Sequence, residues 1–430
     1  MEPAIALLLL CVAGYALVAA RLNRLSIGPA LVFIIAGAIA GRVFGLAQQP
    51  VAGAEIELVV VEVTLALILF TDASTIDLRG LQREASLVVR LLSVGLLLTI
   101  VIGTLLAAAL FPDFPVGVAL LVGAALAPTD AALGQPVVTN QIVPIRIRRL
   151  LNAESGLNDG VATPFVVLAL SLIGAETTGA TDWLRLAVGE GLIGVVAGCA
   201  VGGAGGWLLV RAERAGWTEN LSRQLAVVAL AAGAYATSVA LGGNGFIAAF
   251  VGGLAFGAAS RRAEEGAEIF AEATGSMLSI FVWMIAGATF AGPLVAMVGD
   301  PRPILYAVLS LTVVRMLPVA IALFRSGLRL ETVLFIGWFG PRGLASIVFG
   351  LLGFEALRTA GLSGDLVGAT IAWTIVLSVV LHGLSARPLA RWYGRRIAAA
   401  PEAMPEPGDL PEPRVRRRLD WVADPVAPDE

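Results

Sequence analysis

The sequence contains no lysine, because all 29 of its basic residues are arginine. The chain therefore lacks the lysine of a P-loop nucleotide site, and it cannot form a lysine Schiff base with retinal or pyridoxal phosphate. His382 is the single histidine, which excludes zinc sites of the HExxH type. The two cysteines, Cys11 and Cys199, have neither disulfide-framework nor metal-ligand spacing. We expect no cofactor.

Charge is also scarce. Only 14% of the residues are charged and 58% are hydrophobic, whereas soluble domains have about 25% charged and 45–50% apolar residues. This composition excludes an ordinary soluble enzyme. The net charge of −3 offers no basic surface, so no nucleic-acid partner is expected. The 49 glycines are typical of helices that pack closely in lipid.

Long apolar segments recur along the chain. A membrane-spanning helix needs about 20 predominantly apolar residues, and thirteen segments qualify approximately: 4–20, 27–43, 55–72, 86–111, 115–135, 148–174, 184–210, 221–241, 244–260, 269–291, 303–324, 331–353 and 366–386. The predicted fold is an all-α polytopic membrane protein whose transmembrane domain covers residues 1–397. Residues 398–430 are rich in proline and alternating charge, which predicts a short disordered cytoplasmic tail.

Arginine placement predicts the orientation. If the N-terminus is outside, the inner loops and the stretch after the last span hold 17 arginines, against 4 in the outer loops. By the positive-inside rule the C-terminus is then cytoplasmic. A signal peptide over residues 1–22 is the alternative, but Glu2 replaces the usual positive n-region. We expect a multi-pass protein of a prokaryotic plasma (inner) membrane, with lipid as its surroundings.

Two consecutive spans carry a dense group of polar residues. Ionisable side chains inside a membrane cost several kcal/mol and indicate function. Pro128 interrupts the fifth span and frees backbone carbonyls, and oxygens from carboxylates, hydroxyls and carbonyls suit a hard cation such as Na⁺. The alternative to an ion-binding role is a structural ion pair between a carboxylate and an arginine, and this alternative has most support for Glu154. The polar residues are Thr129 and Asp130 in the fifth span and Glu154, Ser155, Asn158 and Asp159 in the sixth.

The twelfth span is interrupted by the string GPRG at residues 340–343, which contains Arg342. Spans five and twelve thus share a central proline beside a charge. Their offset of seven spans gives them opposite directions, as inverted-repeat transporters require. Asp72, at the end of span three, could line an ion path or simply snorkel to the surface. Arg315 needs an anionic partner, and a structural ion pair with Glu57, Glu62 or Glu272 is expected.

Several strings resemble the monovalent cation–proton antiporter superfamily, in particular its NhaP/NHE sodium–proton exchanger branch. They are LFTDASTIDL at 69–78, PTD at 128–130, ESGLNDG at 154–160, GNGFIAAFVGGLAFG at 243–257 and GPRG at 340–343. The resemblance covers about residues 5–395. It implies a homodimer and an NhaA/NhaP-like fold in which two broken helices cross beside the ion site.

The resemblance also implies roles for the polar group. Asp159 would be the main ion and proton carrier, and Na⁺ would bind at Asp130, Glu154 and Asp159. Thr129 and Ser155 would add oxygens. Two further residues would support the site: Asn158, which stands where electrogenic relatives have an aspartate, and Arg342, which stands where some of them have a lysine and would pair with Glu154.

The expected function is therefore exchange of Na⁺ or Li⁺ for H⁺, electroneutral with one cation per proton. A K⁺/H⁺ antiporter on the same scaffold is the closest alternative. An intramembrane aspartyl protease would need a GxGD motif, and GLSGD at 361–365 lacks its first glycine. A passive channel past a charged ring is less suited to one acidic group beside broken helices.

Overall fold

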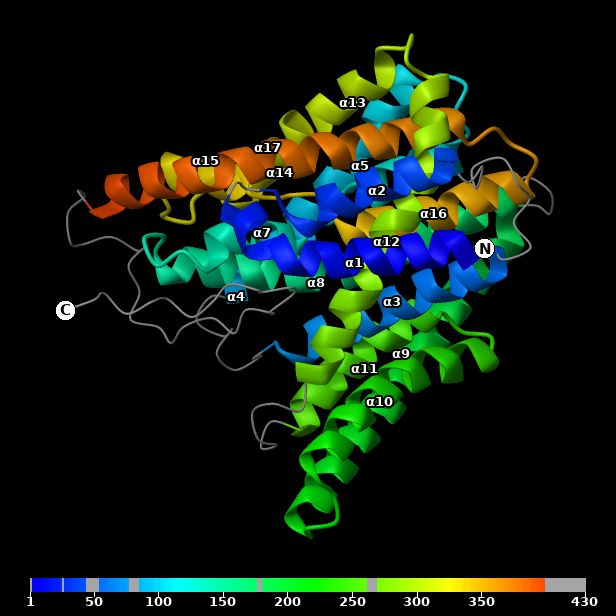
Figure 1. The fold of residues 1–430 in the computed structure, drawn as a ribbon, viewed down its shortest axis with the longest axis vertical. Helices are drawn as coiled ribbons and strands as arrows, with labels where there is room; N and C mark the ends of the chain where they lie inside the picture. The colour runs from blue at the N-terminus through cyan, green and yellow to red at the C-terminus, as the bar shows by residue number, and fades with distance from the viewer. Residues whose placement is uncertain are drawn as a thin grey trace.

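The structure is a computed structural model that describes residues 2–24, 27–43, 54–76, 85–175, 180–260 and 269–398. Within these ranges every regular element is a helix (Figure 1). The all-α polytopic fold is thereby confirmed. The predicted tail falls almost entirely outside the described residues and stays a prediction.

Each of the thirteen expected spans corresponds to one helix or to one interrupted helix. Nine are continuous: α1 (Glu2–Arg24), α2 (Pro29–Val43), α3 (Ala54–Ser74), α8 (Ile145–Ala175), α9 (Ala180–Arg214), α10 (Asn220–Ala240), α11 (Gly245–Ser260), α12 (Ile269–Ala296) and α17 (Asp365–Ala398). By length and apolar composition alone, seven stretches of the described chain could cross a membrane, and four further apolar helices are shorter.

Four of the expected spans are interrupted. They consist of α4 (Ala85–Arg90), the π-helix η2 (Leu91–Gly95) and α5 (Leu96–Leu110); α6 (Val116–Ala125) and α7 (Ala131–Val138); α13 (Arg302–Leu311) and α14 (Val313–Ala322); and α15 (Leu330–Trp338) and α16 (Leu344–Thr359). The breaks predicted at PTD and at GPRG are confirmed. The π-helix and the break at Thr312 carry no such proline signal and were not predicted.

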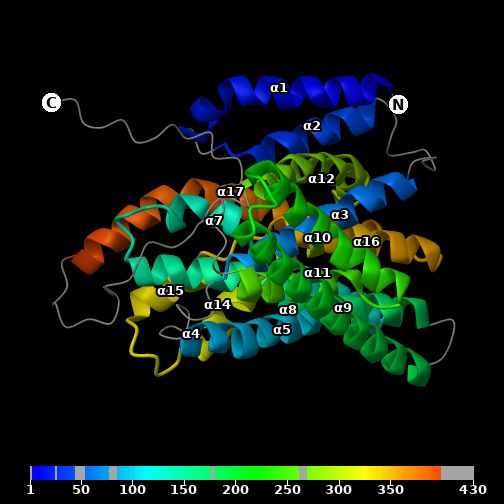
Figure 2. The same cartoon turned by 90° about the horizontal axis from the view of Figure 1, so that it is seen from below.

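The helices are arranged in a bundle from which one helical pair extends. In Figure 1, α9 and α10 project at the lower side below α3, and α11 contacts α3, α9 and α10. Glycines at 198, 202 and 206 let α9 approach the backbone of α11, since an added Cβ there would meet backbone atoms of residues 248, 252 and 256. Figure 2 shows α1 and α2 on one side of the bundle and α5 on the other.

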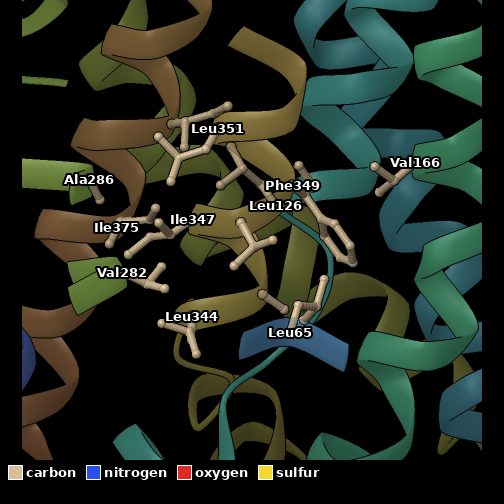
Figure 3. Packing of buried hydrophobic residues seen from close by; sticks show 14 of the residues in the cluster. Leu65, Leu126, Val166, Val282, Ala286, Leu344, Ile347, Phe349, Leu351 and Ile375 are labelled. Atoms are coloured by element: carbon tan, nitrogen blue, oxygen red, sulfur yellow. The ribbon is translucent and has the colours of Figure 1, made fainter. Parts of the chain in front are cut away.

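The second broken helix lies at the centre of the main apolar core. Leu344, Ile347 and Leu351 of α16 pack among side chains of α12 and α17, with Leu126 from the first break nearby (Figure 3). All are less than a tenth exposed. A helix that is buried on every side reads as uniformly apolar. The core therefore contains residues from both broken helices.

Candidate ion-binding site

The two breaks touch each other through the main chain. The amide of Asp130, at the start of α7, donates to the carbonyl oxygen of Pro341 at 2.8 Å. Because α6 ends before residue 126 and α15 ends before residue 339, both segments are non-helical where they meet. Non-helical backbone at membrane depth is stable only where protein or water satisfies it, and here each break partly satisfies the other.

The carboxylate of Asp130 binds the N-terminal ends of two half-helices. Its Oδ1 accepts from the amides of Ala132 at 2.7 Å and Leu133 at 3.4 Å, while Oδ2 accepts from the amide of Leu344 at 2.9 Å. The first two belong to α7 and the third to α16. A negative charge is favourable at a helix N-terminus because the amides there point outward without partners. Asp130 thus holds the crossing together.

Arg342 places a positive charge at the same crossing, where it binds carbonyl oxygens. Its guanidinium is fully buried and donates to the carbonyl oxygens of Ala127, of Pro128 at 3.1 Å and of Ser310 at 3.5 Å. The carbonyls of 127 and 128 are those freed after α6, where a positive charge is favourable. The expected pairing of Arg342 with Glu154 is wrong, because the broken backbone supplies the acceptors instead.

Glu154 pairs with Arg315. The two carboxylate oxygens accept from Nη1 at 2.6 Å and from Nη2 at 2.9 Å, and neither residue is more than 2% exposed. This two-pronged geometry is the strong form of an ion pair. The ion pair expected for Arg315 is confirmed, but the expected partners are wrong. Glu62 instead accepts from the hydroxyl of Tyr235 at 2.8 Å, and the side chain of Glu57 lies outside the described residues.

Three further polar side chains join the first break to α8. The hydroxyls of Thr129 and Ser155 lie 2.9 Å apart, and Nδ2 of Asn158 donates to Oγ1 of Thr129 at 2.6 Å. The other end of the amide, Oδ1, is buried and has no hydrogen-bond partner among the described residues. An unpaired buried acceptor is costly. Asn158 therefore presents an oxygen that could bind a cation or a water molecule.

Asp159 is 8% exposed and lies one turn after Ser155 on α8, as the i, i+4 spacing predicts. Across the described ranges no three carboxylate, histidine or cysteine side chains gather closely enough to hold a metal ion. The carboxylate of Glu154 forms an ion pair with Arg315, which balances its charge. Binding of Na⁺ at Asp130 and Asp159 stays a prediction, as does the role of Asp72, which is half-buried in α3.

A cavity of about 540 Å³ reaches the crossing. It is bounded by the start of α2 and by α7, α12 and α17, and Asp130 and Leu344 lie in its wall. Asp159 is not one of its lining residues. The polar side chains that line it are Asp130, Gln135, Thr139, Asn140, Ser276, Ser279, His382, Arg387 and Arg391. The pair Ser276 and Ser279, spaced three apart in an apolar span, was the overlooked signal in the sequence.

His382, the single histidine, is only 2% exposed. Its Nε2 lies 2.8 Å from the carbonyl oxygen of Trp338, and its Nδ1 lies 2.8 Å from the carbonyl oxygen of Ser378. The ring also stacks on Trp338, with centroids 5.2 Å apart. His382 thereby joins α17 to the last residue of α15, next to the second break.

Comparisons with known proteins identify a family and several relatives. The family model described as "Sodium/hydrogen exchanger, transmembrane" matches residues 7–392. A "Na(+)/H(+) antiporter" of Schizosaccharomyces pombe is 25% identical over 322 residues, which is 66% of each chain. The "K(+)/H(+) antiporter NhaP" of Alkalimonas amylolytica is 28% identical over 376 residues, 86% of this chain and 63% of that protein. The chain thus spans about two thirds or less of these relatives' own length.

A solved structure also resembles the chain. The structure of the sodium proton antiporter MjNhaP1 from Methanocaldococcus jannaschii at pH 8 superposes with a TM-score of 0.74, covering 93% of this chain and 99% of that one. The two sequences are 21% identical. At that identity the likeness establishes the fold.

Proposed function

The chain belongs to the sodium/hydrogen exchanger family, and from that premise we propose that this multi-pass membrane protein exchanges Na⁺ or Li⁺ for protons. The observation that carries the proposal is the crossing itself. Two broken helices meet beside a buried carboxylate, Asp130, at the end of a cavity that polar side chains line. Transporters place their ion sites at such breaks near the membrane midplane.

Cation and proton compete in this proposal. A buried carboxylate can be neutralised by a proton or by a cation, and either one satisfies the same charge. Asp159 is the carrier, and Asp130, Thr129, Ser155 and Asn158 supply oxygens around it. Glu154 is balanced by Arg315 and acts as support. The loaded site then moves between the two sides by rocking of one helical bundle against the other.

One cation moves per proton. Asn158, beside the carrier, has an amide that does not ionise. Glu154 and Arg315 together add no net charge, and the chain has no lysine to carry a second proton. Both carboxylate oxygens of Asp130 accept hydrogen bonds from backbone amides. What remains is one exchangeable carboxylate, which makes the exchange electroneutral.

A K⁺/H⁺ exchanger is the second candidate, and the relative from Alkalimonas amylolytica, named as a K⁺/H⁺ antiporter, supports it. We further propose a homodimer in a prokaryotic plasma membrane, with the N-terminus outside and the C-terminus in the cytoplasm. The arginine distribution supports this orientation. The yeast relative extends the possible hosts to eukaryotic membranes.

The test uses the full chain in proteoliposomes that contain a pH-sensitive dye. An inward Na⁺ or Li⁺ gradient should drive protons outward, and K⁺ should do so weakly. Asp159→Asn should abolish this flux, whereas Asp113→Asn, an exposed position in the loop after α5, should not change it. Exchange that persists in Asp159→Asn, or proton movement that no cation gradient drives, would refute the proposal.

Electroneutrality is tested separately by an imposed membrane potential. At matched ion gradients, voltage alone should drive no net proton or cation flux. A voltage-driven flux would show that a second charge moves.

A further inference from the structure

Most buried hydroxyls in these helices bind their own backbone. A serine or threonine side chain in a helix can donate to the carbonyl four residues earlier. Eight buried hydroxyls of the described chain do so: Thr64, Thr71, Thr99, Thr163, Ser260, Ser279, Thr370 and Thr374. Ser276 departs from this pattern. Its Oγ is buried, the residue is 3% exposed, and no group of the described chain hydrogen-bonds with it.

Ser276 also faces the ion cavity. It lies on α12 with Ser279 and Trp283, and the spacings of three and four place all three on one face of the helix. All three line the cavity whose other walls contain Asp130 and Leu344. Ser346 has an equally unpartnered hydroxyl but is not one of the cavity's lining residues. Ser276 is therefore a buried, unpartnered oxygen in the cavity that reaches the crossing.

A cation at Asp130 needs more oxygens than that carboxylate provides. Hard cations take roughly six oxygen ligands in proteins. Each carboxylate oxygen of Asp130 already accepts at least one amide hydrogen from α7 or α16. Ser279 donates its hydrogen to the carbonyl of Gly275 at 2.6 Å. Ser276 makes no hydrogen bond with the described chain, so nothing there fixes the orientation of its hydroxyl or occupies its lone pairs.

We propose that Ser276 is a ligand of the transported cation on the α12 wall of the cavity, with Ser279 as its neighbour. The inference rests on the proposed exchange function and adds a residue to the same site. A cation that binds Ser276 and Asp130 together connects α12 with the two broken helices. Cation binding then joins two walls of the cavity, which couples occupancy to the position of α12 relative to the broken helices.

Kinetics of Ser276→Ala test the ligand role. The Michaelis constant for Na⁺ should rise about tenfold, as expected for the loss of one ligand interaction, while kcat changes little. The relative rates with Na⁺, Li⁺ and K⁺ should also shift. Ser276→Thr, which keeps the hydroxyl, should restore the Michaelis constant. Ser260→Ala is the matched control, because Ser260 is buried but bonded to its own helix.

Cysteine labelling provides a second readout that does not depend on the turnover rate. Ser276→Cys is made after Cys11→Ala and Cys199→Ala have removed the native thiols. A small water-soluble thiol reagent should label Cys at this position, and Na⁺ should slow the labelling several-fold where choline does not.

The inference is overturned if the Michaelis constant and ion preference of Ser276→Ala match those of the unchanged chain, or if Na⁺ leaves the labelling rate unaltered. Either result with intact exchange would leave the proposed function standing. Absence of cation-driven exchange in the unchanged chain would refute the proposed function itself.

Discussion

Removal of either partner of the Glu154–Arg315 pair should destabilise the fold more than removal of both. The two side chains are joined by hydrogen bonds of 2.6 and 2.9 Å and are nearly inaccessible to solvent. Glu154→Gln leaves the guanidinium of Arg315 without a counter-charge. Arg315→Met leaves the carboxylate of Glu154 without one. Breaking a buried pair in this way costs about 3–5 kcal/mol.

The double variant has no uncompensated charge. Replacement of a whole buried pair by neutral side chains of similar size is often close to neutral in stability. The two single losses would sum to about 6–10 kcal/mol, whereas the double variant should lose far less. The expected coupling energy is therefore about 3 kcal/mol or more. Such a value would identify a pair that acts as one unit.

The assay is a double-mutant cycle on the purified protein in detergent, followed by equilibrium unfolding. A second cycle, with Glu154→Gln and Arg342→Met, is the control, because Arg342 binds backbone carbonyls instead of Glu154. The control cycle should show weak coupling. Additive losses in the first cycle, or equal coupling in both, would refute the assignment of Arg315 as the partner.

Three more outcomes are expected. Asp130→Asn should lower the free energy of unfolding by about 2–4 kcal/mol, because the new amide nitrogen would face backbone donors at the N-terminal ends of α7 and α16. Asp159→Asn should remain as stable as the unchanged chain. Gly202→Ala should separate α9 from α11 and lower the melting temperature, because the added carbon meets the backbone of Gly252, whereas Gly203→Ala finds only a contact at 3.9 Å and should be silent. The apparent affinity for Na⁺, measured from exchange at graded pH, should fall as the pH falls, and an affinity that stays constant over the titration range would contradict competition at one site.

The sequence alone predicted the membrane spans and the two broken helices well, because their signals are local. A run of apolar residues predicts a helix wherever it lies in the chain, and Pro128 or the GPRG string interrupts a helix by its own chemistry. The partners of the charges were harder to predict. Arg342 and Arg315 are both buried arginines in apolar spans, and nothing local distinguishes which one approaches Glu154.

The difference comes from tertiary packing. The carbonyls freed after α6 take Arg342, which leaves Arg315 for Glu154. The role of Asp130 as a double helix cap was hidden for the same reason, since one of its amide donors belongs to Leu344, far along the chain. Ser276 was overlooked because only the folded structure shows which hydroxyls lack a partner.

The crossing also constrains the order in which the protein can mature during synthesis. Asp130 precedes Leu344 by 214 positions, and Glu154 precedes Arg315 by 161. When the segment from Asp130 to Glu154 emerges from the ribosome, the amide of Leu344 and the guanidinium of Arg315 are not yet present, and carboxylates that lack such partners are unfavourable in hydrocarbon. The first half of the chain must therefore remain loosely packed or hydrated until α14 to α16 arrive. Nascent chains that stop before residue 340 should be held by membrane chaperones and degraded, and maturation should be completed in one late step.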